Sequence, residues 1–276
     1  QGFELGAREL DVQVLRAAKH IVREIMNLND ERRELDINST LEALQQIEDT
    51  HQQNNYSTIV YNPKWNKGVI GIVASRLIET YYKPTLVFTE GNNGELVASA
   101  RSISDFDVYE ALDLCSDLFL KFGGHQAAAG LVMEKEKFEE FKERFEKIVS
   151  KRIKEHQRTP SIQIDTIIHI DDLNREFYNF HRKLAPFGPK NMKPILVLKD
   201  QRVTGLVKTM GKEDYHLKFY IRQESTGKNI ECVGFKLGEY VERFRTESFD
   251  IAFTVEENHW KGNVTYYLNL RAVKFH

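Results

Sequence analysis

The segment best suited to chemistry runs from Gly123 to Gly130, with the sequence Gly-Gly-His-Gln-Ala-Ala-Ala-Gly. It joins a single histidine, His125, to residues that carry almost no side-chain bulk. A ligand can approach such a backbone closely and accept hydrogen bonds from its N–H groups. We therefore expect Gly123 and Gly124 to contact a phosphate, and His125 to donate to it or to lie beside a metal on another domain. A tight helix-to-strand turn around a packed histidine accounts for the same residues equally well.

A basic residue between two hydroxyls ends the predicted strand before this segment. In Ser99-Ala-Arg-Ser102, the guanidinium of Arg101 can hold a phosphate through two hydrogen bonds. Ser99 and Ser102 can add neutral donors to the same group. Taken alone, this tetrapeptide is more typical of a surface salt bridge, so the phosphate role is a hypothesis.

A glycine-containing segment, Trp65-Asn-Lys-Gly-Val-Ile-Gly71, leads into a predicted helix. The first turn of a helix attracts anions through its free N–H groups and its dipole. The two glycines also permit close helix packing, which explains them equally well. Arg76 on the same helix is a further phosphate-binding candidate, although a solvated helix charge is the commoner role.

The later part of the chain is locally basic. Residues 181–228 contain 11 Lys and Arg but 4 Asp and Glu, a balance of +7 against −2 for the whole chain. Aromatic residues are interleaved with these charges. Single strands bind to basic grooves with aromatic platforms, where stacking contributes ~1–3 kcal/mol per base. We take Lys190, Lys208, Tyr215 and Lys218 as binding candidates here, while about half of the aromatic residues must fill a core instead.

Length and composition limit the class of protein. The 276 residues suffice for roughly two domains, and 41% hydrophobic with 29% charged residues is typical of a soluble globular protein. No run reaches the ~20 apolar residues of a membrane span, and no signal peptide is recognisable. The chain opens with Gln1, so we expect a piece of a longer protein. Cys115 and Cys232 lie far apart, which favours two unpaired thiols in a reducing cytoplasm.

Hydrophobic periodicity predicts an α/β region in the first half of the chain. Residues from about 8 to 50 follow helical spacing, with an interruption at Asn29-Asp30, and such a polar-faced helix often connects domains. Strands and helices then alternate. We expect strands at 57–61, 85–89, 96–100 and 131–133 and helices at 68–82, 107–122 and 134–153. Gly123-Gly124 would then end the helix 107–122.

A polar segment ending in Pro160 separates this region from a β-rich one. We expect alternating residues at 162–165 and 167–170, a helix at 172–184 and strands at 195–198, 201–206, 215–221, 230–235, 249–256 and 265–273. Several short strands at this spacing suggest a small barrel, for which the five-stranded oligonucleotide-binding (OB) fold is the natural candidate.

No motif of a metal site, a P-loop or a serine nucleophile is present. The tightest group of Asp and His is Asp165, His169, Asp171 and Asp172. Two-metal hydrolysis needs several such side chains to converge on ions ~3.5–4 Å apart. We interpret this group as an ordinary polar edge and expect no metal site in the chain.

Several segments together resemble the bacterial RecJ family, the single-strand-specific DNA exonucleases of the DHH phosphoesterase superfamily. They are Trp65-Asn-Lys-Gly-Val-Ile-Gly-Ile-Val-Ala-Ser-Arg-Leu-Ile78, Ser99-Ala-Arg-Ser102, Phe122-Gly-Gly-His-Gln-Ala-Ala-Ala-Gly130, Leu184-Ala-Pro-Phe-Gly-Pro-Lys-Asn191 and the interdomain-helix string Asn29-Asp-Glu-Arg-Arg-Glu34. Gly-Gly-His also occurs in other DHH-associated domains, and the barrel that follows Pro-Phe-Gly is what points to RecJ.

The resemblance implies an architecture. Residues 1–54 would be connecting helices, 55–156 a DHH-associated α/β domain and 157–276 an OB-fold-like β-barrel. A DHH domain, which would hold two manganese or magnesium ions, would precede them and is absent from this chain, so this portion itself needs no cofactor. Arg101 and His125 would stabilise charge at the scissile phosphate, and Ser99 and Gly124 would contact the same phosphate or the 5′ end.

Two positions depart from the family pattern. The family usually has His before Pro-Gly after the tryptophan, where this chain has Asn66-Lys67. It usually has Gly where Lys190 stands, a change that alters a turn or adds a phosphate contact.

The implied function is 5′-to-3′ hydrolysis of single-stranded DNA in repair and recombination, in the cytoplasm and away from membranes. The partners would be single-stranded DNA and, from the family alone, a single-strand-binding protein. This chain would bind the strand without cutting it. The alternatives are a non-catalytic replication factor, a phosphoesterase for RNA or small oligonucleotides, and a structural portion without affinity for nucleic acid.

Overall fold

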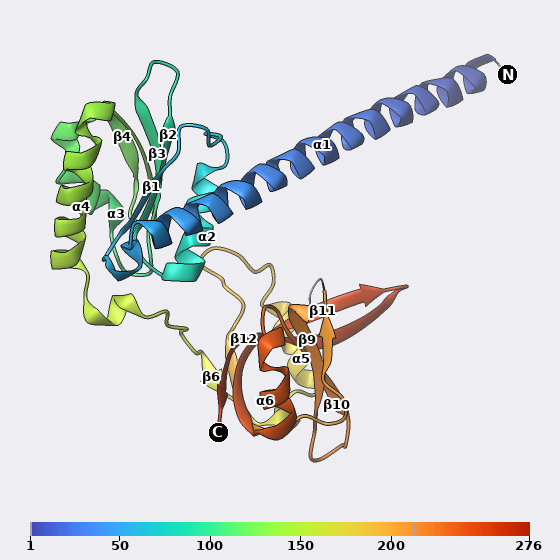
Figure 1. Ribbon diagram of the computed structural model, residues 1–276. Helices are drawn as coiled ribbons and strands as arrows, with labels where there is room; N and C mark the ends of the chain where they lie inside the picture. Colours follow the sequence, from blue (N-terminus) through green and yellow to red (C-terminus); the bar gives the residue numbers. More distant parts are fainter. Residues whose placement is uncertain (1, 212–213) are drawn as a thin grey trace. The chain divides into compact units, whose positions relative to one another are not determined.

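The computed structural model describes residues 2–211 and 214–276, with side chains from Val14 onward. The chain separates into two compact units, Gln1–Pro160 and Ser161–His276. They are called unit 1 and unit 2 and are described separately (Figure 1).

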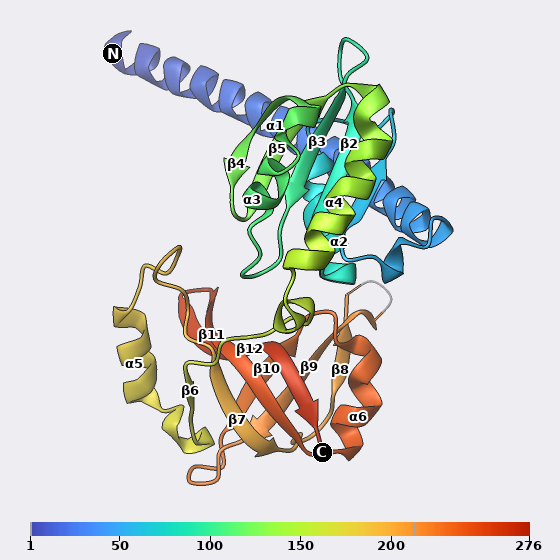
Figure 2. The ribbon, with the colours of Figure 1, turned by 90° about the vertical axis from the view of Figure 1, so that its left-hand side faces the viewer.

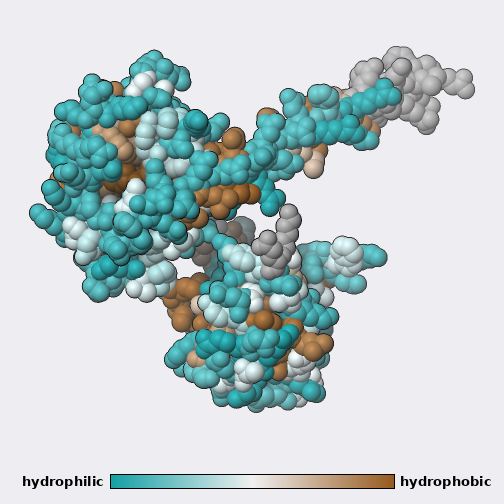
Figure 3. Space-filling view, viewed as in Figure 1, coloured by the Kyte–Doolittle hydropathy of each residue, from teal (hydrophilic) through white to brown (hydrophobic). Residues whose placement is uncertain are grey.

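Unit 1 begins with a single long helix, α1 (Gly2–Asp49). The predicted interruption at Asn29-Asp30 is wrong, because the helix continues through it and Arg32 Nη2 donates to the Asn29 side chain at 3.0 Å. The apolar residues Val14 and Ile21 are 61% and 55% exposed, and Figure 3 shows apolar surface among polar side chains along α1. Among the side chains that the structure describes, burial in α1 begins at Asp36, and Ala43 and Ile47 are fully buried.

A five-stranded sheet forms the centre of unit 1, in the order β1-β2-β3-β5-β4. β1 and β2 are parallel, and the other neighbours are antiparallel. The strands are β1 (Thr58–Tyr61), β2 (Thr85–Glu90), β3 (Leu96–Arg101), β4 (Phe119–His125) and β5 (Ala128–Met133).

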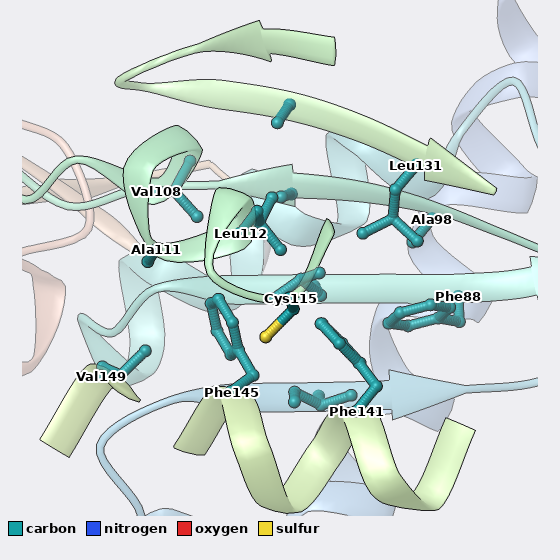
Figure 4. Close-up of a cluster of buried hydrophobic side chains, with 14 of the residues drawn as sticks. Phe88, Ala98, Val108, Ala111, Leu112, Cys115, Leu131, Phe141, Phe145 and Val149 are labelled. Atoms are coloured by element: carbon teal, nitrogen blue, oxygen red, sulfur yellow. The ribbon is translucent and has the colours of Figure 1, made fainter. Parts of the chain in front are cut away.

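Helices cover the two faces of this sheet unequally (Figure 2). The helices after α1 are α2 (Ile70–Tyr81), α3 (Val108–Asp113) and α4 (Phe138–Arg152). α3 and α4 close one face over a large core, in which Cys115 and Phe141 pack against Leu131 of β5 (Figure 4). On the other face, α2 and the end of α1 enclose a smaller core with Val60 of β1 and Val87 of β2. The residues of β5 and β4 take no part in this smaller core among those described, so that half of the face stays open.

The predicted helix at 107–122 is wrong. Helix α3 ends at Asp113, and β4 then forms a hairpin with β5. A short apolar run such as Leu118-Phe-Leu120 does not distinguish helix from strand by its periodicity. Glycine is common just past the end of a helix, but here Gly123 and Gly124 pair with Gly130 and Ala129 of β5 in a close ladder. Gly123-Gly124 is therefore part of a strand and does not end a helix.

Unit 2 contains a seven-stranded sheet in the order β6-β7-β11-β12-β10-β9-β8. Its strands are β6 (Thr166–Ile167), β7 (Leu196–Gln201), β8 (Lys208–Met210), β9 (His216–Arg222), β10 (Asn229–Gly234), β11 (Phe249–Trp260) and β12 (Asn263–Phe275). Its helices are α5 (Arg175–Lys183) and α6 (Val241–Thr246). Phe219, Phe249 and Phe253 lie at the centre of its core.

Two details of unit 2 differ from the expected five-stranded barrel. The predicted strand 201–206 is wrong, because β7 ends at Gln201 and Gly205 adopts a φ of 80°, which interrupts an extended run. No strand pairing among the described residues joins β6 to β8, so the sheet is not closed by a ladder. A backbone hydrogen bond of 2.7 Å from Thr204 N to Tyr220 O nevertheless ties the segment after β7 to β9.

Short 3-10 helices connect the elements. They are Gln52–Asn54, Ser116–Leu118, Lys135–Lys137, Glu155–Arg158, Ile170–Asp172 and Gly238–Tyr240. Cys115 and Cys232 are both buried and unpaired, which confirms the prediction of free thiols. Even α1 is not apolar enough to cross a membrane, nor is any other helix in the described part of the chain.

Candidate functional site

The open half of the unit 1 sheet carries three rows of residues across β3, β5 and β4. Pairing aligns Val97, Val132 and Lys121 in one row and Ser99, Gly130 and Gly123 in the next. A third row aligns Arg101, Ala128 and His125. Residues paired in this way, and those two apart along a strand, point to the same face. Ser99, Arg101, Gly123 and His125, all expected at one site, therefore share a face.

A groove of about 560 Å³ follows this face and meets the start of α2. Gly123 and Gly130 form its floor, and Ser99 and Arg101 line its β3 side. Lys67, Gly68 and Gly71 contribute the wall at the start of α2, and Lys121 lines the β4 side. None of these last four residues was a binding candidate by itself in the sequence. The groove thus has a nearly bare backbone floor between basic side chains.

The basic side chains of the groove are not neutralised. Lys67, Arg101 and Lys121 form no ion pair with a carboxylate in the part of the chain that the structure describes. Arg101 Nη1 donates to Ser99 Oγ at 2.9 Å and to Ala100 O at 2.8 Å. The guanidinium is half-buried and fixed by neutral acceptors, so it keeps its positive charge available for an anion.

The two glycines before His125 serve different purposes. A Cβ on Gly123 would meet nothing within 4 Å, because this residue faces the groove. A Cβ on Gly124 would lie 2.4 Å from Ala128 O and 2.5 Å from Ala129 Cα. Gly124 is thus required by the packing of its own hairpin, and Gly123 is the one that leaves room for a ligand.

His125 and Ser102 lie at the closed end of the hairpin. His125 is exposed, and its Nδ1 accepts from Ala127 N at 3.2 Å. Ser102 N donates to Ala127 O, and Ser102 Oγ donates to Phe106 O at 2.6 Å. The hydroxyl of Ser102 is therefore used to hold the loop, while Nε2 of His125 makes no hydrogen bond within the described residues.

Arg76 does not line the groove. Its Nε donates to Asp36 Oδ1 at 2.8 Å and its Nη2 to Asp36 Oδ2 at 2.7 Å. Asp36 is only 2% exposed, and the hydrogen bonds to it raise the pKa of Arg76. Arg76 therefore fastens α2 to α1, a structural use of its charge.

The candidates of unit 2 are spread over the outer side of its sheet. Tyr220 of β9, Glu231 of β10 and Tyr267 of β12 form one row on the side away from the core. Lys218 Nζ lies 2.6 Å from Glu231 Oε2, and this hydrogen bond raises the pKa of Lys218. Its cross-strand neighbour Lys208 is exposed and has no ion pair among the described residues. The aromatic rings are thus accompanied by cations that are partly neutralised.

Tyr215 and Lys190 both lie in exposed turns. Tyr215 is 53% exposed and its ring lies 5.3 Å from that of His216. Lys190 adopts a φ of 69° in the turn between Gly188 and Asn191. Such a backbone conformation favours glycine. Lys190, which stands where the family usually has Gly, therefore adopts the turn at a conformational cost and places an exposed cation there.

Sequence reasoning missed the hairpin between β11 and β12. It ends in Lys261 and Gly262, whose φ values of 48° and 81° are those of a tight two-residue turn. Trp260 before the turn is 69% exposed, with Lys261 Nζ 5.8 Å from its ring centroid. The dipeptide Lys261-Gly262 between the two predicted strands was the available signal.

No group of three or more His, Cys, Asp or Glu side chains could hold a metal ion in the described residues. In the tightest group, the Asp171 carboxylate accepts from Ser225 N at 3.1 Å, which lowers the pKa of Asp171. Asp172 accepts from His169 N at 2.8 Å. These residues do not fit a two-ion centre, and we derive no metal-dependent step from them.

Comparison with known proteins identifies the two units. The model of the DHHA1 domain matches residues 54–151, and that of the RecJ OB domain matches residues 164–272. The chain belongs to the RecJ family. It carries the DHHA1 and OB domains in that order, which confirms the expected sequence of domains.

Individual relatives agree with the family models. A Bacillus subtilis protein named single-stranded-DNA-specific exonuclease RecJ is 35% identical over 228 residues, which are 82% of this chain and 28% of that protein. The Escherichia coli protein of the same name is 26% identical over 258 residues, 89% of this chain and 43% of that protein. The chain therefore spans less than half the length of these relatives.

A solved structure shares the fold. RecJ from Thermus thermophilus, in complex with Mn²⁺, superposes on this chain with a TM-score of 0.72 at 23% identity. The superposed part is 91% of this chain and 35% of the Thermus chain. A second structure of that protein, with Mg²⁺, gives a TM-score of 0.67.

Proposed function

We propose that the chain is the strand-binding portion of a RecJ-like exonuclease that degrades single-stranded DNA from its 5′ end in repair and recombination. The observation that carries this proposal is the groove of unit 1. Its glycine floor admits a sugar–phosphate backbone, and Lys67, Arg101 and Lys121 around it are free of carboxylate partners among the described residues. A polyanion needs such unneutralised donors, because charge-assisted hydrogen bonds to phosphate supply most of the affinity.

We assign the charge of the reacting phosphate to Arg101, which lines the groove, and to His125, which shares its face of the sheet but lies outside the residues that line the groove. Donors fixed in advance where negative charge develops are the most effective form of electrostatic catalysis. Arg101 is held by Ser99 Oγ and Ala100 O, so it loses little freedom on binding. His125 lies in the same row, two strand spacings of about 4.8 Å away, which leaves room for a phosphate between them.

Unit 2 would bind the bases of the same strand. In OB folds, oligonucleotides bind to the face of the second and third strands and to the loops beside it. Here this face contains Lys218 and Tyr220, with Lys208 on the next strand and Tyr215 beside it. Trp260 on the β11–β12 hairpin adds an exposed ring. Lys190 would contact phosphate from its turn.

Hydrolysis itself would require manganese or magnesium ions held outside these residues, in a DHH domain of the intact enzyme. The chain described here would bind and orient the strand without cleaving it. An interaction with a single-strand-binding protein, and a cytoplasmic location, rest on the family alone.

Binding measurements test this proposal. Fluorescence anisotropy should give tighter binding to long single-stranded DNA than to duplex DNA, long RNA or a dinucleotide, and affinity should fall with added salt. Equal or higher affinity for RNA or dinucleotides would favour the phosphoesterase alternative. A complete lack of salt-dependent binding would leave only a structural role.

A cleavage assay tests the division of labour. The chain is incubated with single-stranded DNA and manganese, and no products should form. Cleavage that follows the chain through purification and disappears in Arg101→Ala would contradict the assignment of catalysis to another domain.

A further inference from the structure

The guanidinium of Arg101 is oriented by two neighbours from different elements. Ser99 Oγ accepts from Nη1 at 2.9 Å, which fixes one side of the planar group. The group also lies directly against Gly71, in the first turn of α2. A Cβ built on Gly71 would be 2.7 Å from Arg101 Nη2, 3.0 Å from Ser99 Oγ and 3.4 Å from Arg101 Cζ.

We propose that Gly71 is a positioning residue, whose missing side chain lets the Arg101 guanidinium lie beside the start of α2 and point its Nη2 into the groove. The proposal rests on the proposed function, because it concerns how that site holds a phosphate. Nη2 makes no hydrogen bond within the described residues, so it is the donor left for a ligand. The free N–H groups of the first turn of α2 lie on the same wall.

The backbone of Gly71 does not itself require glycine. Its φ is not positive, and it lies inside a regular helix, where alanine is more favourable than glycine. The atoms that an alanine would displace are the tip of a flexible arginine and a serine hydroxyl. Gly71→Ala should therefore leave the fold intact and move the guanidinium, which separates a positioning role from a structural one.

Ser99 acts on the same group through a hydrogen bond to Nη1. Its hydroxyl oxygen is used as an acceptor for Arg101, so we assign it to the orientation of the guanidinium before any contact of its own with DNA. Ser99→Ala provides a second variant that removes one restraint without adding bulk.

The test is a double-mutant cycle in the 276-residue chain, with affinity for single-stranded DNA measured by fluorescence anisotropy at several salt concentrations. Gly71→Ala should weaken binding about tenfold and lower the salt slope by about 0.7, the contribution of one phosphate contact on a single strand. In an Arg101→Ala background, Gly71→Ala and Ser99→Ala should each have no further effect, because both act through the guanidinium.

Thr80→Ala is the matched control. Thr80 is exposed, and it lies on the opposite side of α2 from Gly71 at 3.6 residues per turn. The substitution Thr80→Ala raises helix preference much as Gly71→Ala does, and it should leave the affinity for single-stranded DNA unchanged. Circular dichroism confirms folding of each variant, and if Gly71→Ala were unfolded, the Ser99→Ala cycle would decide the question.

The outcomes are separable. If Arg101→Ala weakens binding but Gly71→Ala does not, the positioning role is wrong and the proposed function stands. If Gly71→Ala weakens binding equally with and without Arg101, its effect is structural and the inference also fails. If Arg101→Ala has no effect on binding, the groove is not the phosphate site and the proposed function itself is wrong.

Discussion

The groove of unit 1 and the outer sheet face of unit 2 use charge in opposite ways. Around the groove, Lys67, Arg101 and Lys121 have no carboxylate partner in the described residues, and the floor is glycine. On the outer face of unit 2, Lys218 is paired with Glu231, and tyrosine rings stand beside the pair. The first surface is suited to phosphate and the second to bases.

This difference predicts a division of the binding energy. Phosphate contacts release counterions, so their contribution falls with salt. Stacking on aromatic rings is much less sensitive to salt and tolerates any base. We expect variants in the groove to change the salt slope, and variants of the exposed rings in unit 2 to change affinity at constant slope.

The largest effect should follow from filling the groove. A Cβ on Gly130 would have its closest contact at 3.7 Å, so Gly130→Leu can be accommodated with its side chain over the floor. Each charge-assisted hydrogen bond to phosphate contributes roughly 1.5–3 kcal/mol, so blocking access should cost about 100-fold in affinity. Anisotropy with single-stranded DNA measures this. Asn93→Leu, in the exposed β2–β3 turn, adds the same bulk elsewhere, and an equal loss in that variant would contradict the groove as the site.

Loss of the exposed tryptophan should have the next largest effect. Trp260→Ala removes one stacking platform, worth ~1–3 kcal/mol per base, so we expect roughly a tenfold loss of affinity. The slope of affinity against salt should stay unchanged, and Trp260→Phe should restore most of the binding. A change of slope in Trp260→Ala equal to that of a groove variant would remove the distinction between the two surfaces.

Two lysines provide a more direct comparison. Lys121→Ala removes an unpaired cation and should lower the salt slope by about 0.7, with a loss of about threefold in affinity. Lys218→Ala removes a cation already neutralised by Glu231 and should change both quantities less. The two titrations are run at the same salt concentrations. Equal slopes for both variants would mean that the Lys218–Glu231 pair opens on binding.

The smallest expected effect is on the stability of unit 2, which should depend on pH through His181. His181 of unit 2 is buried between Phe177 and Phe187, and its Nε2 has no hydrogen-bond partner in the described residues. Burial lowers its pKa, nearby Lys193 lowers it further, and Glu256 and Glu257 oppose the shift.

Because the unfolded histidine keeps its ordinary pKa of about 6.5, it takes up a proton before the folded one does. Unit 2 should therefore lose stability as the pH falls below about 6.5, toward the lowered pKa of the folded state. His181→Phe, which keeps the ring stacking, should raise the Tm and reduce this dependence. Calorimetry from neutral to mildly acidic pH checks this, and an unchanged pH dependence in the variant would contradict the assignment to His181.

Much of the fold could be predicted because it depends on local patterns. The alternation before Pro160, the β-rich part after it and the helix α5 follow from periodicity and from glycine and proline positions. Strand β4 could not be predicted in this way. Its residues have the local pattern of a helix end. They form a strand because Gly123 pairs with Gly130, and that pairing depends on the whole β4–β5 hairpin.

The candidate site shows the same division. The residue types together with the resemblance to the RecJ family singled out Arg101, His125 and Gly123, because the two segments taken alone fit a salt bridge or a tight turn as well. Lys121 was missed, since its face is defined only once β4 is a strand.

The sequence by itself determined which residues can carry charge to a phosphate and most of the helices and strands, because these properties belong largely to single residues and their near neighbours. Only the tertiary structure decided which of those charges remain available. Arg76 is paired with Asp36, which is 40 positions away, and Lys218 with Glu231 on the adjacent strand. Among the described residues, Arg101 donates to neutral acceptors alone. A charge is neutralised by whatever lies within a few ångströms of it in space, and distance along the chain does not report that.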